Sequence, residues 1–223
     1  MKTRLFLLSA VSLVFFTFFS YTVAKERWTK LDFDTTVKVQ DHIPRKFDLA
    51  FSYLSLLGSV EVTIGFCLIL AFLALIRGQI LVVLGWLVIV PASFGEVFGK
   101  LILFHPAPPV FLHRTLLPTN LPSFYVHTDF SYPSGHLTRT IFIVTVFIII
   151  TIASEKSNLY KWAILGSCLT LAFLMALTRI YLGEHWLSDV IGGGLLGIAA
   201  GLFASILILK TGQDNIPTDA RGR

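Results

Sequence analysis

Six long apolar runs constrain this chain more than any other feature. They lie at about residues 5–24, 50–76, 79–103, 137–154, 160–181 and 187–209. A helix needs about 20 apolar residues to cross the hydrocarbon core of a bilayer, and the runs are close to that length. Barrel strands would instead show short segments of alternating hydrophobicity. The sequence therefore predicts an all-α fold, an integral membrane bundle of six transmembrane helices.

The composition agrees with a membrane protein. Of 223 residues, 55% are hydrophobic and 14% are charged, whereas soluble domains carry about 25% charged residues. The net charge is +5, but the bases are scattered over short loops and the tail, so we expect contact with the lipid bilayer and no nucleic-acid partner. Cys67 and Cys168 each lie inside an apolar run without a CxxC pair, which predicts packing residues and no zinc site.

The remaining segments define the domain organisation. Residues 1–24 are expected to form the first transmembrane helix, with a signal peptide as the alternative, because the apolar run exceeds the usual signal core of about 7–15 residues. Residues 25–48 mix apolar and charged side chains, which is typical of an interfacial amphipathic segment. Residues 49–210 are expected to form the main membrane bundle. The polar tail, 211–223, is expected to be disordered.

The number of spans also predicts topology. Six spans place both termini on one side of the membrane, and Lys2 and Arg4 favour the cytoplasm as that side. The loop 105–136 and the turn 180–187 then emerge together on the opposite side. We therefore expect a multi-pass protein of the cell (cytoplasmic) membrane whose functional site faces outside.

Ionisable and small polar residues gather where this loop and this turn meet the bilayer. They are Lys100, Ser134, Gly135, His136, Arg179, His185 and Asp189. Charged groups at membrane depth are costly and are functional candidates for that reason. Because the two sets come from different spans on the same side, the sequence predicts one shared site.

The residue types in this set indicate phosphate chemistry. His185 and Asp189 are four residues apart at the start of a predicted helix, so the carboxylate can hold one ring N–H and leave the other nitrogen nucleophilic. Arg179 lies across the Gly183 turn, where its guanidinium can clamp an anion. Gly135 permits close backbone approach at a helix N-terminus that favours anions. The set does not resemble a metal cage, and we expect no metal and no cofactor.

At these residues the sequence resembles the type 2 phosphatidic acid phosphatase family, the membrane relatives of vanadium haloperoxidases. The family has three motifs: Lys, six residues, Arg-Pro; then Pro-Ser-Gly-His; then Ser-Arg, five residues, His, three residues, Asp. The second motif, PSGH at 133–136, is complete, and the third is present at 178–189 with Thr178 in place of serine. The resemblance covers about residues 95–195 by motif and all six helices by architecture.

The first motif departs from the family pattern. The segment KLILFHPAPP (100–109) keeps Lys100 and Pro108, but Ala107 stands where the family has arginine. Arg139 lies one turn into the helix that follows PSGH, where a cation is mildly unfavourable through the helix dipole. We hypothesise that Arg139 replaces the missing guanidinium. The alternative is a headgroup contact or a solvated rim residue.

The resemblance implies a two-step mechanism. His185 attacks phosphorus and becomes phosphohistidine, while Asp189 orients the ring. His136 donates a proton to the leaving alkoxide and then activates water. The residues implied to bind the phosphate oxygens are Lys100, Ser134, Gly135 and Arg179.

The predicted function is a membrane phosphatase that acts on a lipid phosphate. The family's substrates include phosphatidic acid, phosphatidylglycerophosphate and polyprenyl diphosphates, and the sequence does not choose among them. Two alternatives remain open. One is a lipid phosphotransferase that uses the same phosphoenzyme, and the other is a non-catalytic relative that only binds lipid phosphates, which Ala107 makes plausible.

Several residues have a structural interpretation as well. Glu96 and Lys100 are four residues apart, so they can form an ion pair on one helix, or Glu96 can orient Lys100 as a phosphate ligand. His105 flanks a proline turn and could face the site, but it is interpreted mainly as a loop residue. Glycines recur every four residues from 193 to 201, which predicts close helix packing. The spacing alone does not distinguish packing within the bundle from a homo-oligomer.

Overall fold

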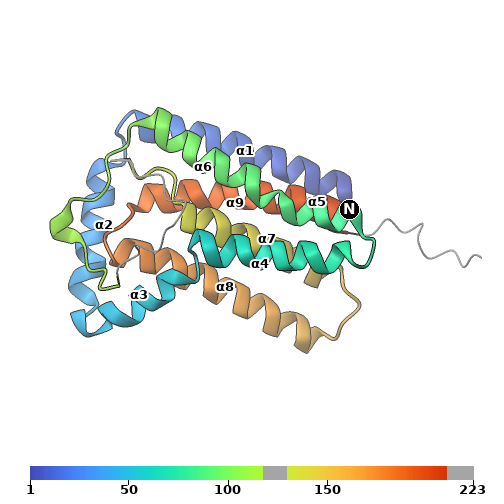
Figure 1. The fold of residues 1–223 in the computed structure, drawn as a ribbon. Coiled ribbons are helices and arrows are strands. Elements are labelled where there is room, and N and C mark those ends of the chain that lie inside the picture. Colours follow the sequence, from blue (N-terminus) through green and yellow to red (C-terminus); the bar gives the residue numbers. More distant parts are fainter. Residues whose placement is uncertain (118–129, 210–223) are drawn as a thin grey trace, which may run out of the picture.

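The computed structural model describes residues 1–117 and 130–209, and every regular element in those ranges is a helix (Figure 1). The elements are α1 (Lys2–Ala24), α2 (Thr29–His42), η1 (Arg45–Phe47), α3 (Asp48–Leu56), α4 (Val60–Leu75), α5 (Ile80–Leu87), α6 (Ile89–Leu103), η2 (Val110–Leu112), α7 (Gly135–Ala153), α8 (Asn158–Tyr181) and α9 (Leu187–Ile208).

The described residues contain six helical stretches that are long and apolar enough to cross a membrane. They are Lys2–Ala24, Arg45–Leu75, Ile80–Leu103, Gly135–Ala153, Asn158–Tyr181 and Leu187–Ile208. The predicted all-α bundle of six spans is confirmed, and only the second span begins well before its predicted start. The predicted disordered tail lies outside the described residues.

Two of the spans are interrupted. The second is broken between α3 and α4, where Ser59 caps α4 by accepting a 3.3 Å hydrogen bond from the amide of Val62. The third span is divided at Val88, which lies between the end of α5 and the start of α6. The first break matters for the site, because it brings the backbone of Gly58 against α7 and α8: a Cβ at Gly58 would lie 2.9 Å from His136 Cδ2 and 3.0 Å from the Met175 side chain.

The centre of the bundle is the packing of α7 against α9, with α1 along α9 and α8 along α7 (Figure 1). The predicted glycine ridge forms this contact. A Cβ at Gly197 would lie 2.6 Å from the carbonyl oxygen of Thr138, and a Cβ at Gly201 would lie 2.7 Å from Thr145 Cβ. Only residues without a side chain allow two backbones to approach so closely. The ridge is therefore used within the bundle and is not available to a second chain.

Helix α2 lies across the end of the bundle where α7 and α9 begin (Figure 1). Its amphipathic pattern is inverted with respect to a soluble helix: Asp32, Thr36 and Gln40 are buried, whereas Leu31 and Phe33 are exposed. The Gln40 amide donates to the carbonyls of Leu112 (2.7 Å) and Tyr181 (2.9 Å). The polar face thus fastens α2 to the loops at this end. A location of the apolar face in the lipid interface stays a prediction.

The glycine ridge leads to a prediction on stability. We expect Gly197→Ala to lower the free energy of unfolding by about 1–3 kcal/mol, because the added methyl group meets the α7 backbone. Gly194→Ala is the matched control, since a Cβ at Gly194 has nothing within 4 Å. Thermal unfolding of the purified variants in detergent measures the difference. Equal midpoints for the two variants would contradict the assigned packing.

Candidate active site

The two segments that carry the predicted site residues are joined by backbone hydrogen bonds at one end of the bundle. The amide of Arg114 donates to the carbonyl of Leu182 (3.0 Å), and the amide of Ser134 donates to the carbonyl of Asp189 (3.0 Å). The second bond connects the start of α7 directly to the start of α9. The expectation that the loop 105–136 and the turn 180–187 lie on the same side is therefore confirmed for their described residues.

His185 is held by Asp189. Its Nδ1 lies 3.2 Å from Asp189 Oδ2, and the same oxygen accepts a 2.9 Å hydrogen bond from the amide of Trp186, which caps α9. The carboxylate is thus fixed by its own helix and is fully buried. With a proton on Nδ1, the opposite ring nitrogen of His185 is bare and can act as a nucleophile.

The surroundings of His185 keep its ring neutral. Burial lowers the pKa of His185 well below its usual value, and the nearby cations Arg179, Lys100 and Arg139 lower it further. At pH 7 the imidazole therefore has a free lone pair, which a nucleophile requires. These three cations belong to α6, α7 and α8, so charged residues of three helices lie near the same ring.

Arg179 is positioned by the turn that ends α8. Gly183 has φ +67°, a left-handed conformation that favours glycine, and the turn lets the amide of His185 donate to the carbonyl of Arg179 (3.2 Å). The buried guanidinium of Arg179 donates to Ser55 Oγ on α3 and to the carboxylate of Glu184. Ser55 and Glu184 were not predicted from the sequence, because neither belongs to a recognisable motif.

The start of α7 presents Ser134, Gly135 and His136 to the same region. Ser134 occupies the N-cap position of α7, but its hydroxyl makes no capping hydrogen bond. A side chain at Gly135 would overlap the carboxylate of Glu96, so only glycine permits that carboxylate so close to the helix N-terminus. His136 is half-buried and interacts electrostatically with His185. The two histidines thus belong to one cluster.

Glu96 links two buried cations from different helices. Its carboxylate accepts from Lys100 Nζ (2.8 Å) and from Arg139 Nη1 (2.6 Å). All three side chains are less than a tenth exposed. The ion pair between Glu96 and Lys100 is therefore present. Arg139 is buried, so the alternative that it is a solvated rim residue is wrong. Its guanidinium lies inside the cluster, whereas Ala107 is exposed on the loop.

Three donors on the predicted site residues have no hydrogen-bond partner among the described residues. They are Ser134 Oγ, Arg139 Nε and Arg179 Nε. A buried donor without a partner is costly, and native structures contain few of them. Three on one cluster would suit a ligand with several acceptor oxygens.

His105 contacts the site as well, although its sequence context indicated mainly a loop residue. Its Nε2 lies 3.6 Å from Asp189 Oδ1 and 3.3 Å from Ser188 Oγ. The buried carboxylate of Asp32 on α2 accepts from Ser188. The signal for Asp32 was present, because Asp32, Thr36 and Gln40 recur every four residues opposite the apolar face.

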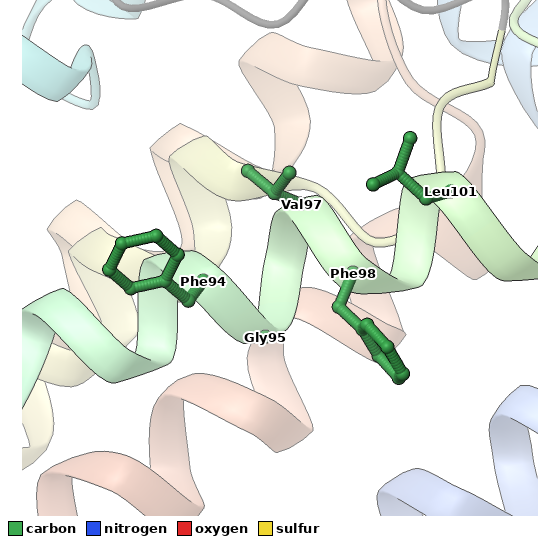
Figure 2. Close-up of a pocket in the computed structure, with 5 residues that line it drawn as sticks. All are labelled: Phe94, Gly95, Val97, Phe98 and Leu101. Atoms are coloured by element: carbon green, nitrogen blue, oxygen red, sulfur yellow. The ribbon is translucent and has the colours of Figure 1, made fainter.

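Helix α6 separates the polar cluster from an apolar surface. On its outer side a shallow hollow is lined by Phe94, Gly95, Val97, Phe98 and Leu101 (Figure 2). Glu96 and Lys100 of the same helix are buried in the cluster. Within the part of the chain that the structure describes, no group of three His, Cys, Asp or Glu side chains is arranged to hold a metal ion.

Comparison with known proteins gives one family. Residues 79–213 match the model described as PAP2 superfamily. Undecaprenyl-diphosphatase from Sulfolobus acidocaldarius is 35% identical over 124 residues, which are 56% of this chain and 52% of that protein. The chain thus spans about half the length of this curated relative.

Two solved structures share the fold. One is the first transmembrane PAP2 type phosphatidylglycerolphosphate phosphatase from Bacillus subtilis, with a TM-score of 0.70 at 18% identity over 88% of this chain and 93% of that chain. The other is LpxE from Aquifex aeolicus, with a TM-score of 0.56 at 24% identity over 78% and 94% of the two chains. These likenesses establish a common arrangement of helices.

The Glu96 pairings lead to a second prediction. Glu96→Gln leaves Lys100 and Arg139 without this buried negative charge, which should cost about 3–5 kcal/mol of stability. Inorganic phosphate should raise the unfolding temperature of Glu96→Gln more than that of the wild type, because the anion replaces the lost carboxylate. Thermal scans with phosphate or with chloride at equal ionic strength measure this.

The matched control is Glu155→Gln, which removes an exposed carboxylate in the turn after α7. Its phosphate response should equal that of the wild type. A Glu96→Gln protein that responds to phosphate no more than Glu155→Gln would contradict an anion site at this cluster.

Proposed function

The chain belongs to the PAP2 superfamily, and from this premise we propose that it hydrolyses the phosphate or diphosphate group of a membrane lipid through a phosphohistidine on His185. The observation that carries the proposal is the buried His185, whose Nδ1 lies 3.2 Å from Asp189 Oδ2 and whose pKa is lowered by burial and by three nearby cations. A nucleophile needs a free lone pair, and a phosphoryl group needs positive charge around it. This cluster offers both.

The proposed reaction has two steps. The bare ring nitrogen of His185 forms a bond to phosphorus, the bond from phosphorus to the leaving oxygen breaks, and His136 gives that oxygen a proton. His136 then takes a proton from water, whose oxygen displaces phosphate from His185. Asp189 stabilises the charge that forms on the ring of His185 in the first step.

The phosphate oxygens are proposed to bind the groups that surround His185. Ser134 Oγ, Arg139 Nε and Arg179 Nε are buried donors that match the acceptors of a phosphoryl group. Lys100 and the amide of Gly135 complete the proposed set. Arg139 supplies the second guanidinium that Ala107 does not, which supports catalysis despite the incomplete first motif.

The proposed substrate is an amphiphile whose tail stays in the bilayer. Helix α6 bears the buried Lys100 on one side and the exposed Phe94 and Phe98 on the other, so the headgroup site lies next to a surface suited to lipid chains. The names of the similar proteins indicate an isoprenoid diphosphate or a phosphatidylglycerolphosphate. Phosphatidic acid is included because of the family resemblance. An active site on the outer face of the cytoplasmic membrane is part of the proposal.

A direct test is phosphate release by the purified protein from phosphatidic acid, phosphatidylglycerophosphate and undecaprenyl diphosphate. We expect release from at least one lipid in the presence of a chelator, and no release above background by His185→Ala. Full activity of His185→Ala would contradict the phosphohistidine. Loss of activity with the chelator would contradict a metal-independent reaction.

The same assay separates the alternatives. A phosphotransferase would yield a phosphorylated acceptor in competition with free phosphate when a lipid or sugar alcohol is added. A non-catalytic relative would bind the lipids without releasing phosphate. Either result would replace hydrolysis as the function.

Arg139 provides a third prediction. Arg139→Ala should lower kcat/KM by about 100-fold or more, the usual effect of losing one donor to the transition state. Arg139→Lys keeps the charge without the guanidinium fork and should recover part of the loss. Arg77→Ala, at the exposed turn between α4 and α5, is the control and should match the wild type. Wild-type kinetics in a folded Arg139→Ala protein would show that Arg139 has no part in catalysis.

A further inference from the structure

A second histidine, His105, lies on the opposite side of the Asp189 carboxylate from His185. Oδ2 of Asp189 faces His185 Nδ1 at 3.2 Å, and Oδ1 faces His105 Nε2 at 3.6 Å. Asp189 and His105 are both buried. The two oxygens of one carboxylate therefore each face a histidine ring, and only His185 belongs to the family motif.

His105 is also connected to the start of α9 through Ser188 and Asp32. Its Nε2 lies 3.3 Å from Ser188 Oγ, which donates to Asp32 Oδ2 (2.7 Å). The amide of Ser188 donates to Asp32 Oδ1 (2.8 Å). Because Ser188 gives its proton to Asp32, its oxygen is free to accept one from His105. Helix α2 thus supports the residue next to Asp189 in the chain.

The position of His105 is fixed by its backbone neighbours. Its carbonyl accepts a 3.0 Å hydrogen bond from the amide of Ser131, and its ring lies edge-on to Tyr132. The next carbonyl, that of Pro106, accepts from the indole of Trp186 (2.8 Å). The loop that bears His105 is therefore tied to the segments before α7 and α9.

The charge states favour an N–H of His105 that points at Asp189. Burial lowers the pKa of His105 to about 4, so the ring is neutral at pH 7 and carries one proton. Burial also raises the pKa of Asp32, while hydrogen bonds from Ser188 lower it. Nε2 faces three oxygens, from Ser188, Asp32 and Asp189. A lone pair on Nε2 would be repelled by the lone pairs of these oxygens. The tautomer that carries its proton on Nε2 is therefore favoured.

We propose that His105 and Asp32 are positioning residues, which hold Asp189 so that its other oxygen keeps the proton of His185 on Nδ1 and leaves Nε2 bare. The proposal rests on the proposed function of His185 as the nucleophile. His105 acts on Asp189 Oδ1, and Asp32 acts on the first turn of α9 through Ser188. Neither residue contacts the phosphoryl group in this scheme.

The consequence is a specific effect on kcat. Oδ1 of Asp189 makes no hydrogen bond within the described residues, so the His105 N–H at 3.6 Å acts on it electrostatically. Without this N–H, the buried carboxylate loses that partner and the His185 ring is no longer confined to one tautomer. Outer-shell partners of metal-binding histidines are typically worth about 10- to 100-fold in metal affinity or activity, and we expect an effect of the same order for a partner that orients His185 through Asp189. Substrate binding should change little, because the cations that contact the phosphate stay in place.

Three substitutions of His105 test this role. His105→Ala should lower kcat by about 10- to 100-fold with little change in KM. His105→Gln, whose amide nitrogen reaches about as far as Nε2, should recover most of the loss, whereas His105→Asn, which is shorter, should not. His113→Ala is the control, because His113 is exposed and its ring contacts the Pro108 carbonyl. Equal kcat for His105→Ala and the wild type would overturn the proposal.

Asp32 is tested in the same way. Asp32→Asn keeps the shape but replaces one acceptor oxygen by a donor that opposes the Ser188 hydroxyl, so kcat should fall in the same direction. Asp41→Asn, at an exposed position near the end of the same helix, should match the wild type. A fall in thermal stability of Asp32→Asn without a fall in kcat would show that Asp32 only supports the fold.

A measurement that does not need turnover separates this proposal from the proposed function. Long-range proton–nitrogen NMR of ¹⁵N-histidine-labelled protein shows which ring nitrogen of His185 carries the proton, with His185→Ala to assign the signals. We expect Nδ1–H in the wild type and in His113→Ala, and a mixture of tautomers in His105→Ala. An unchanged tautomer in His105→Ala would overturn the positioning role. Absence of phosphate release from the wild type would instead contradict the proposed function. The NMR result would still test the positioning role of His105, because it does not depend on turnover.

Discussion

The close approach of the α7 and α9 backbones is the constraint on which the rest of the structure depends. Gly193, Gly197 and Gly201 of α9 let it lie directly against α7, and the bond from the Ser134 amide to the Asp189 carbonyl sets where the two helices begin. Each helix bears its candidate site residues near its start. Packing in the middle of the membrane therefore places the two histidines, the serine and the carboxylate at one end.

The second requirement is charge balance at membrane depth. Lys100, Arg139 and Arg179 are all buried, and a buried cation is stable only with compensating acceptors. Glu96 compensates the first two and Glu184 the third. These carboxylates leave part of the hydrogen-bonding capacity of both guanidinium groups unused. The buried cations are therefore compensated within the fold, and the unused donors are available for the anion proposed as ligand.

Much of the fold and of the candidate site could be predicted from the sequence. The six spans, the shared side of the two loops and the spacing of His185 and Asp189 follow from local patterns, because helix length and the four-residue repeat are properties of the chain itself. The inference that Arg139 belongs to the cluster followed from a cation placed unfavourably near a helix N-terminus. The close contact between Glu96 and Gly135 could not be predicted in the same way, because it joins α6 to α7.

The sequence by itself determined the helices, the membrane class and the motif residues, since each depends on residues that are near one another in the chain. Only the tertiary structure decided that the glycine ridge packs inside the bundle, that Glu96 joins two cations, and that His105 and Asp32 lie beside Asp189. The contacts of His105 and Asp32, for example, connect three separate segments, namely α2, the loop that follows α6, and the start of α9. The physical reason is that a contact between distant segments depends on how whole helices pack, and no local pattern contains that information.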